Sequence, residues 1–128
     1  MENQLKQVKK FRDVFNLGVN TTPTLLTDKK HSLHYNLLLE ELNEYKEAVE
    51  NNDVVEVADA LGDILYLAFG AVLEHGMQHI ITDVFAEIHE SNMSKLDAEG
   101  NPIFREDGKI MKGENYFKPN ISQFLIED

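Results

Sequence analysis

DALGDILY, residues 59–66, carries two carboxylates four positions apart and then runs into an apolar segment. At helical spacing, one face of this region is aliphatic. That face consists of Val54, Val57, Leu61, Leu65, Ala68 and Val72. Glu56, Asp59 and Asp63 form a stripe on the opposite side, and beyond Asp63 the helix is apolar almost all round, which is typical of burial. The acids therefore lie where a buried helix meets a polar cavity or a partner helix.

A second acidic helix is predicted upstream, over residues 28–50. Its apolar face consists of Leu38, Leu42, Tyr45 and Val49. Glu41 and Glu44 lie three positions apart at the edge of this face, whereas Glu40 and Glu47 point to the other side. Glu41 and Glu44 are therefore expected to flank the core and not to stand in open water.

The short segment ENND, residues 50–53, separates the two helices, and Asp53 can cap the second one. Because so short a connection joins antiparallel neighbours, Glu41 and Glu44 are expected to face acids of the second helix. The candidates across the gap are Glu56, Asp59 and Asp63. Clustered carboxylates repel one another, and sites made only of oxygen suit hard cations, chiefly Mg²⁺ or Mn²⁺. The alternative interpretation is that each acidic stripe is a solvated helix face.

Two further helices are predicted, over residues 3–16 and 79–96. Residues 16–27 form a loop, after which Thr27 or Asp28 can cap the next helix. The helix that starts at Val54 is expected to run to about residue 75 and to stop at Gly76. We interpret His31 and His34, three positions apart on a helix, as surface residues.

From Asp97 onward the chain is loop-like, and EDGK at residues 106–109 predicts a tight hairpin turn. Residues 121–126 are expected to pack back on the protein. The sequence therefore predicts an all-α, four-helix-bundle-like fold with a C-terminal loop or small hairpin. We expect residues 1–128 to form a single domain.

Composition narrows the classes of function. The net charge of −11 argues against a general nucleic-acid binder, which usually has a basic surface. The absence of cysteine excludes disulfides and thiolate metal sites. The apolar runs are too short to span a bilayer, and the N-terminus lacks the apolar core of a signal peptide, so we expect a soluble cytoplasmic protein without a membrane partner.

Polar residues continue the apolar face of the helix predicted over 79–96, namely Asn92 and Lys95. Lys109 and Lys112 follow in the glycine-containing tail. Near an acidic metal site, these residues suit a phosphate ligand. The alternatives are that Lys95 extends to solvent along its aliphatic stem and that the tail is a plain surface hairpin.

The ordered set of motifs resembles the all-α nucleoside triphosphate pyrophosphohydrolase superfamily, which includes MazG-type enzymes, dimeric all-α dUTPases and phosphoribosyl-ATP pyrophosphohydrolase. The family pattern is E-x-x-E, a spacer and then E-x-x-D on two antiparallel helices. EELNE supplies the first half as Glu41 and Glu44. The second half is either EVAD, which gives Glu56 and Asp59, or the acid before ILY, which gives Asp63. The second placement puts Ala60 where a glutamate is expected.

The resemblance extends through residues 33–120, including YLAFGAVLEHG, VFAEIHESNMSKL and DGKIMKGENYFKP. It implies Mg²⁺, with Mn²⁺ as a substitute, held by Glu41, Glu44 and Asp63, with Glu56 or Asp59 as the fourth ligand. It also implies that substrate phosphates lie near Asn92 and Lys95, joined by Lys109 and Lys112. Glu40 or another carboxylate not bound to the metal, with Glu41 as a further candidate, is expected to act in catalysis.

The implied reaction converts a nucleoside triphosphate and water into a nucleoside monophosphate and pyrophosphate, with dUTP or another pyrimidine nucleotide as a candidate substrate. We expect the nucleobase to contact the N-terminal helix and the 16–27 loop through Phe11 and Asn16. A homodimer or homotetramer is also expected. Two alternatives stay open: a phosphoribosyl-ATP pyrophosphohydrolase, and a catalytically degenerate helical oligomer with a binding role.

Overall fold

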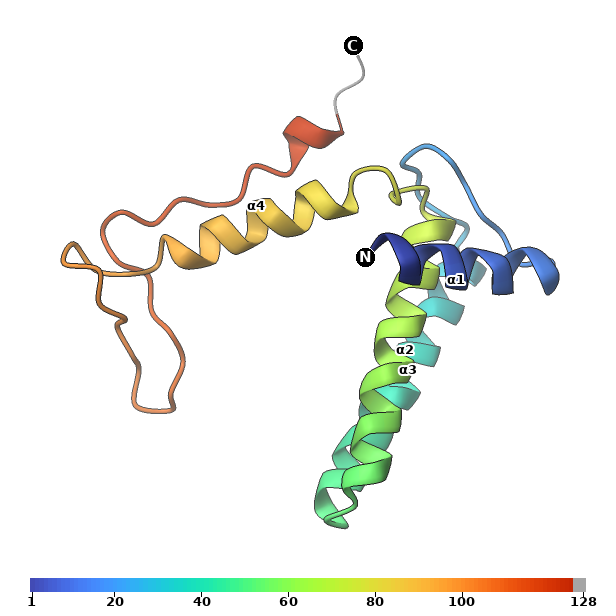
Figure 1. Ribbon diagram of the computed structural model, residues 1–128, viewed down its shortest axis with the longest axis horizontal. Helices are drawn as coiled ribbons and strands as arrows, with labels where there is room; N and C mark the ends of the chain where they lie inside the picture. The colour runs from blue at the N-terminus through green and yellow to red at the C-terminus, as the bar shows by residue number, and fades with distance from the viewer. Residues whose placement is uncertain (126–128) are drawn as a thin grey trace. The chain divides into compact units, whose positions relative to one another are not determined.

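The computed structural model describes residues 1–125. The chain divides into two compact units, Met1–His79 and Ile80–Asp128. The regular elements of the described residues are α1 (Glu2–Val14), α2 (Asp28–Glu50), α3 (Val54–Glu74), α4 (Ile81–Met93) and the short 3-10 turn η1 (Ser122–Phe124) (Figure 1). Within residues 1–125 the one β-type pairing is an isolated bridge between Phe104 and Ile110, so the all-α prediction is confirmed. That residues 1–128 form a single domain stays a prediction.

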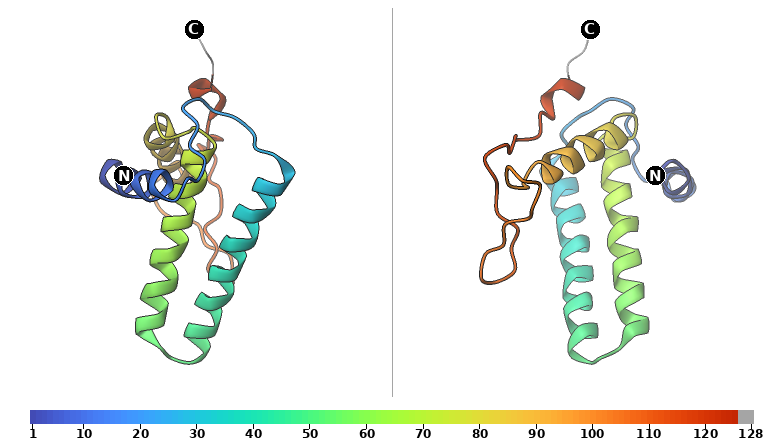
Figure 2. Two further views of the ribbon diagram at one scale, coloured as in Figure 1. Left: turned by 90° about the vertical axis from the view of Figure 1, so that its right-hand side faces the viewer. Right: turned by 60° about the vertical axis from the view of Figure 1, so that its left-hand side comes forward.

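Helices α2 and α3 form an antiparallel hairpin, which is the largest packed element of the first unit (Figure 2). The Thr27 side chain accepts a hydrogen bond from the backbone N–H of Lys30, and Asp53 accepts one from Glu56. Both side chains satisfy amide groups that a helix start leaves without partners, which explains why α2 and α3 begin where they do. The predicted starts of both helices and both caps are therefore confirmed.

The acid-bearing faces of α2 and α3 pack together, as the short connection between the helices predicted. Leu42 of α2 is 55% exposed and Leu65 of α3 is 59% exposed, although both belong to the predicted apolar faces. Ala48 and Ala60 are buried instead. Small side chains allow close approach of two helices, so the acid-bearing faces meet. The expectation that the aliphatic faces form a core does not hold for Leu42 and Leu65 within residues 1–125, because periodicity identifies an apolar face without identifying the partner that covers it.

Helix α1 packs against α3, where Leu5 and Val8 are buried (Figure 1). The helix ends at Val14, two residues before the predicted end, and Asn16 follows with a left-handed φ of 56°. The loop after α1 is fixed to the end of α3, since the backbone N–H of Asn20 donates to Leu73 at 3.0 Å. These contacts hold the loop against the hairpin.

The loop and the end of α3 approach most closely at Gly76. This residue has a φ of 70°, and a Cβ there would overlap the backbone of Thr22. The backbone N–H of Thr24 donates to the carbonyl of His75 at 2.9 Å, next to this contact. Only glycine tolerates both constraints, so the predicted stop at Gly76 is confirmed and has a physical cause.

In the second unit, α4 begins two residues after the predicted start and ends three residues before the predicted end. Ser94 and Lys95 form a turn, since the N–H of Lys95 donates to the carbonyl of Asn92. The Ser91 hydroxyl donates to the Phe117 carbonyl at 2.9 Å, so the tail is bonded to α4. The prediction of a helix over 79–96 was therefore too long at both ends.

The predicted turn at residues 106–109 is confirmed. The N–H of Arg105 donates to the carbonyl of Lys109 at 2.8 Å, and Gly108 has a φ of 88°. Part of the segment 121–126 forms η1, and residue 126 lies outside the described residues. None of the helices in residues 1–125 combines the length and apolar character of a membrane span.

Candidate active site

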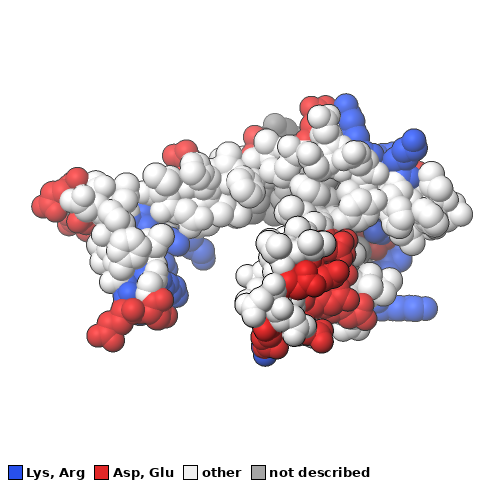
Figure 3. All heavy atoms as spheres, turned by 60° about the horizontal axis from the view of Figure 1, so that its bottom comes forward, with Lys and Arg blue, Asp and Glu red and all other residues white. Residues whose placement is uncertain are grey.

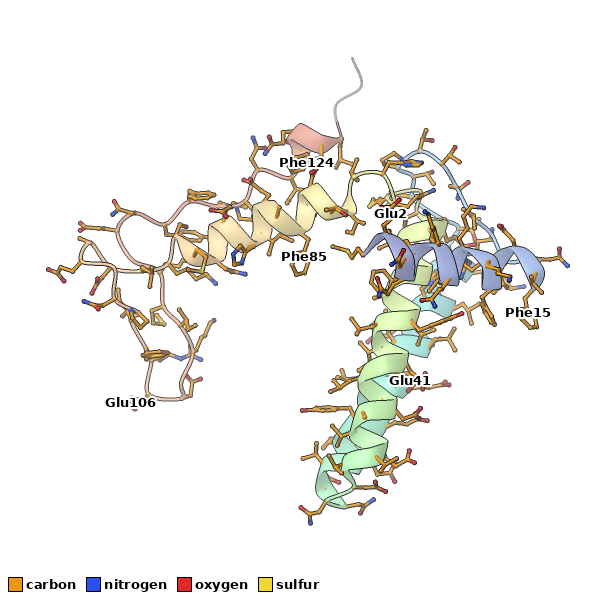
Figure 4. The ribbon with its side chains drawn as sticks, in the orientation of Figure 1. Glu2, Phe15, Glu41, Phe85, Glu106 and Phe124 are labelled. Atoms are coloured by element: carbon orange, nitrogen blue, oxygen red, sulfur yellow. The ribbon has the colours of Figure 1, made fainter. Side chains whose placement is uncertain are left out.

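Three carboxylates converge on the inner faces of the α2–α3 hairpin. One oxygen each from Glu41, Glu44 and Asp63 lies within 4.8 Å of the other two. Glu41 and Glu44 stand on one side of α2, and Asp63 reaches them from the antiparallel α3. Figure 4 places Glu41 in the middle of the hairpin. We name these three residues the acidic triad; it combines the first half of the sequence motif with Asp63, one of the two candidate aspartates for the second half.

The negative charges of the acidic triad are not balanced by the protein groups around Glu41. Oε2 of Glu41 is buried and has no hydrogen-bond partner among the described residues. Burial raises the pKa of Glu41 to about 7, and the neighbouring carboxyl groups of Glu44, Asp63 and Asp59 add to the effect. A cation would satisfy the orphaned oxygen and relieve the repulsion. The residues fit a hard divalent ion, because all the donors are carboxylate oxygens.

Glu56 and Asp59 lie next to the acidic triad and not within it. With Glu44, they line a groove of about 390 Å³ whose other walls are Glu47, Ala48, Asn51 and Asp53. Figure 3 shows the carboxylates that gather on this end of the hairpin. Ala60, at the position where the motif expects a glutamate, is only 2% exposed and offers no ligand. Glu40 is exposed on α2 outside the triad.

A mostly apolar pocket of about 500 Å³ opens beside the acidic triad within the first unit. Leu37 and Leu67 line it, and each lies one helical turn from a triad member on its own helix. Phe11 and Asn16, the two residues predicted to contact a nucleobase, both line this pocket. Its volume falls within the range of about 300–1,000 Å³ that is usual for small-molecule sites. We name it the α1 pocket.

The sequence matches the phosphoribosyl-ATP pyrophosphohydrolase family over residues 8–92, which include the acidic triad and most of the α1 pocket. The chain belongs to this family. It is therefore a pyrophosphohydrolase, an enzyme that hydrolyses phosphoric anhydride bonds, as the sequence resemblance implied.

Other comparisons with this pyrophosphohydrolase are weaker. No curated protein matches it. A solved structure from Exiguobacterium sp. 255-15, provisionally named an NTP pyrophosphohydrolase, shares 23% sequence identity with it, with a TM-score of 0.49, over 95% of this chain and 91% of that one. The assignment depends on the family match.

A buried charged cluster forms one wall of the α1 pocket. Glu74 of α3 pairs with Arg12 of α1 at 3.0 Å and bonds to Nε2 of His34 of α2 at 2.8 Å. Burial opposes ionisation of Glu74, but the hydrogen bond from His34 and the charge of Arg12 outweigh it and lower the pKa of Glu74. The cluster therefore fixes all three helices around the pocket.

Sequence reasoning missed this cluster, and the surface assignment of His34 was wrong. The side chain of His34 is only 15% exposed because it turns inward to Glu74. The available signal was Glu74 itself, a single carboxylate at the end of the stretch of α3 that is otherwise apolar after Asp63. Arg12 gave no signal, because arginines on an amphipathic helix usually face water.

The predicted phosphate-binding residues all belong to the second unit. Asn92 is exposed on α4, and Lys95 is half-buried just past its end. Lys109 follows the hairpin turn, and Nζ of Lys112 lies 4.8 Å from the centre of the Tyr116 ring. Their roles stay predictions.

Proposed function

We propose that this pyrophosphohydrolase depends on Mg²⁺ and converts nucleoside triphosphates into nucleoside monophosphates and pyrophosphate, with dUTP or another pyrimidine nucleotide as a candidate substrate. The observation that supports this most directly is the position of the acidic triad, one helical turn from a pocket of small-molecule size. A triphosphate at the triad and a nucleoside in the α1 pocket fit this arrangement.

Glu41, Glu44 and Asp63 are the proposed ligands of Mg²⁺ or Mn²⁺, and Glu56 or Asp59 is the candidate for a further oxygen. When bound, the ion supplies positive charge that stabilises the phosphoryl oxygens and makes water a better nucleophile. In the overall reaction, the bond between the α- and β-phosphoryl groups breaks as a water oxygen joins phosphorus. Glu40, or another carboxylate that does not bind the ion, accepts the proton that water loses.

The remaining predicted residues act on the two ends of the substrate in this proposal. Phe11 stacks on the nucleobase, and Asn16 offers both a donor and an acceptor to it. Asn92, Lys95, Lys109 and Lys112 are proposed to neutralise the phosphates and the leaving pyrophosphate.

We also propose that the chain forms a homodimer or homotetramer. The hairpin leaves several large aliphatic side chains exposed, in the two faces that were expected to form a core: Leu42, Val49, Leu61 and Leu65. A second copy of the hairpin would cover such a surface, since apolar patches of this kind mark interaction sites. Light scattering on the purified protein measures the oligomer, and a monomer at micromolar concentration would contradict this proposal.

Two alternatives have an observation in their favour. Phosphoribosyl-ATP as the substrate is favoured by the description of the matching family. A degenerate oligomer with a binding role is favoured by the replacement of a motif glutamate by Ala60.

The decisive experiment measures pyrophosphate release from canonical NTPs, dNTPs and phosphoribosyl-ATP, each with and without Mg²⁺. Metal-dependent release from one or more free triphosphates is expected. Release from phosphoribosyl-ATP alone would support the first alternative. No release from any nucleotide, together with no thermal shift on addition of Mg²⁺ or Mn²⁺, would support the second.

A further inference from the structure

The charged wall of the α1 pocket contains more hydrogen-bond donors than its own acceptors can use. Arg12, Lys30, His34 and Glu74 all line the pocket. Two of them are cations and one is a carboxylate, so a ligand at this wall meets an excess of positive charge. The question is which polar groups of the wall are still available to a ligand.

The carboxylate oxygens of the wall are already occupied. Oε1 of Glu74 accepts from Nε2 of His34 at 2.8 Å. Oε2 of Glu74 faces Nη2 of Arg12 at 3.0 Å and Nζ of Lys30 at 3.8 Å. The Glu74 side chain is 6% exposed, so it is closed off from a ligand. A hydrogen-bond donor on a ligand therefore finds no free carboxylate at this wall.

Donors of the wall are available. Nε of Arg12 donates to the carbonyl of Gly18 at 2.8 Å and Nη2 faces Glu74, whereas Nη1 has no hydrogen-bond partner within residues 1–125. Lys30 has three N–H donors. Its side chain is 53% exposed, and its ion pair with Glu74 is long, at 3.8 Å. Arg12 and Lys30 therefore both offer N–H groups that a ligand can use.

We propose that Arg12 and Lys30 are specificity-determining residues, which make the α1 pocket select a carbonyl oxygen over an amino group at position 4 of a pyrimidine or position 6 of a purine. Uracil is selected over cytosine, and hypoxanthine over adenine. A carbonyl oxygen accepts from Nη1 of Arg12 and Nζ of Lys30, whereas an exocyclic amino group at the same place cannot accept from either donor. This inference rests on the proposed function, because it assumes that a nucleoside occupies the pocket.

Matched substrates test this directly. The ratio kcat/KM is measured with Mg²⁺ for dUTP against dCTP and for ITP against ATP, pairs that differ at one carbonyl or amino group and in the proton on the ring nitrogen beside it. We expect a preference of about tenfold or more for the carbonyl member of each pair. Equal ratios, or a preference for the amino members, with pyrophosphate still released, would overturn the inference and leave the proposed function intact.

Substitutions of Lys30 and Arg12 test whether these two residues cause the preference for the carbonyl substrates. Lys30→Met keeps the aliphatic stem and removes the donors, so it should move the preference toward unity, mainly by raising KM for dUTP. Lys29→Met is the matched control, since Lys29 is exposed on the same helical turn and does not line the pocket. An unchanged preference in Lys30→Met, with Arg12→Lys also unchanged, would overturn the assignment. If Arg12→Lys does not fold, the preference measured in Lys30→Met alone decides the assignment, because Lys30 is half exposed and its substitution should not unfold the protein.

A binding measurement separates this inference from catalysis. The dissociation constants of dUMP and dCMP are compared in metal-free protein by calorimetry, and dUMP should bind about tenfold more tightly. If no nucleotide is hydrolysed, the proposed function fails, and this comparison still tests the pocket. Inorganic phosphate is added as a competitor: if it displaces dUMP from wild type but not from Lys30→Met, the wall holds an anion, which would overturn the assignment to the base.

Discussion

Arg12 of α1 and Glu74 of α3 form an ion pair of 3.0 Å in which the side chains are 11% and 6% exposed. The pair joins two helices that are 62 positions apart in sequence at this point. It also shapes the wall of the α1 pocket. Its contribution to stability and its contribution to the pocket can be measured separately.

We expect Glu74→Gln to lower the free energy of unfolding by about 3–5 kcal/mol, because it leaves Arg12 buried without a counter-charge. Denaturant unfolding monitored by circular dichroism gives this value. Glu2→Gln is the control: it removes an exposed pair with Lys6 at 3.4 Å and should change stability by less than about 1 kcal/mol. Similar small losses of unfolding free energy in both variants would mean that the buried Arg12–Glu74 pair stabilises the fold no more than an exposed pair does.

The same pair predicts a pH dependence. The pKa of Glu74 in the folded protein lies below its ordinary value of 4.5, so ionised Glu74 stabilises the fold above that value. The contribution is lost as the pH falls through the folded pKa. The difference in unfolding free energy between wild type and Glu74→Gln should therefore be constant near neutral pH and shrink in acid. A difference that grows as the pH falls below 4.5 would contradict this sign.

Gly18 lies against the same carboxylate. A Cβ at residue 18 would overlap Oε2 of Glu74, so Gly18→Ala must displace the buried ion pair. We expect a loss of about 1–3 kcal/mol in thermal or denaturant unfolding. Gly62→Ala is the matched control, because a Cβ at this position in α3 meets no atom within 4 Å. That variant should gain about 0.5–1 kcal/mol through helix propensity.

The acidic triad predicts opposite effects of one substitution with and without metal. Without a divalent ion, Glu41→Gln should be as stable as wild type or more stable, because it removes one of three mutually repelling carboxyl groups. Mg²⁺ at about 100 times its dissociation constant should stabilise wild type by about 2.7 kcal/mol. Glu41→Gln and Asp63→Asn should lose most of that gain and all turnover.

Thermal unfolding with and without Mg²⁺, together with pyrophosphate release, measures these effects. Glu50→Gln, at the end of α2, changes the net charge equally and should respond to Mg²⁺ as wild type does. Full Mg²⁺-dependent stabilisation in both triad variants would exclude the triad as the metal site.

Phe11 and Phe15 provide a matched pair for the nucleoside pocket. Their rings contact each other at a tilt of 38°, with 4.6 Å between centroids, but only Phe11 lines the α1 pocket. Phe11→Ala should weaken nucleotide binding by about 1–3 kcal/mol, seen as a higher KM, while the Mg²⁺ thermal shift is unchanged. Phe15→Ala should leave KM unaltered. Equal effects of the two substitutions would indicate that the nucleoside binds elsewhere.

The helix boundaries in the hairpin were predictable because their causes are local. Thr27 and Asp53 bond to amides three residues ahead, and Gly76 supplies a φ of 70° that other residues avoid. Each of these interactions lies within a few residues of sequence. The end of α4 was less predictable. Asn92 and Lys95 continue the helical spacing in the sequence, but the N–H of Lys95 donates to the carbonyl three residues back and not four, so the chain forms a turn there.

The candidate site was predictable in part. The i,i+3 spacing of Glu41 and Glu44 and the short connection to α3 were sufficient to predict that acids of α3 lie opposite them, and Asp63 does. Spacing did not decide between Asp63, Asp59 and Glu56, because all three lie on one stripe of α3. In the structure, Asp63 lies with Glu41 and Glu44, whereas Glu56 and Asp59 line the neighbouring groove.

By itself, the sequence determined the helices, their caps and the pair of acidic motifs, because each depends on the chemistry of residues that are close along the chain. Only the tertiary structure decided which face of each helix is covered, and that Arg12, His34 and Glu74 form one buried cluster beside a pocket. The reason is that a buried charge is stable only with partners, and these partners come from three helices. Their meeting depends on packing geometry, which local periodicity does not contain.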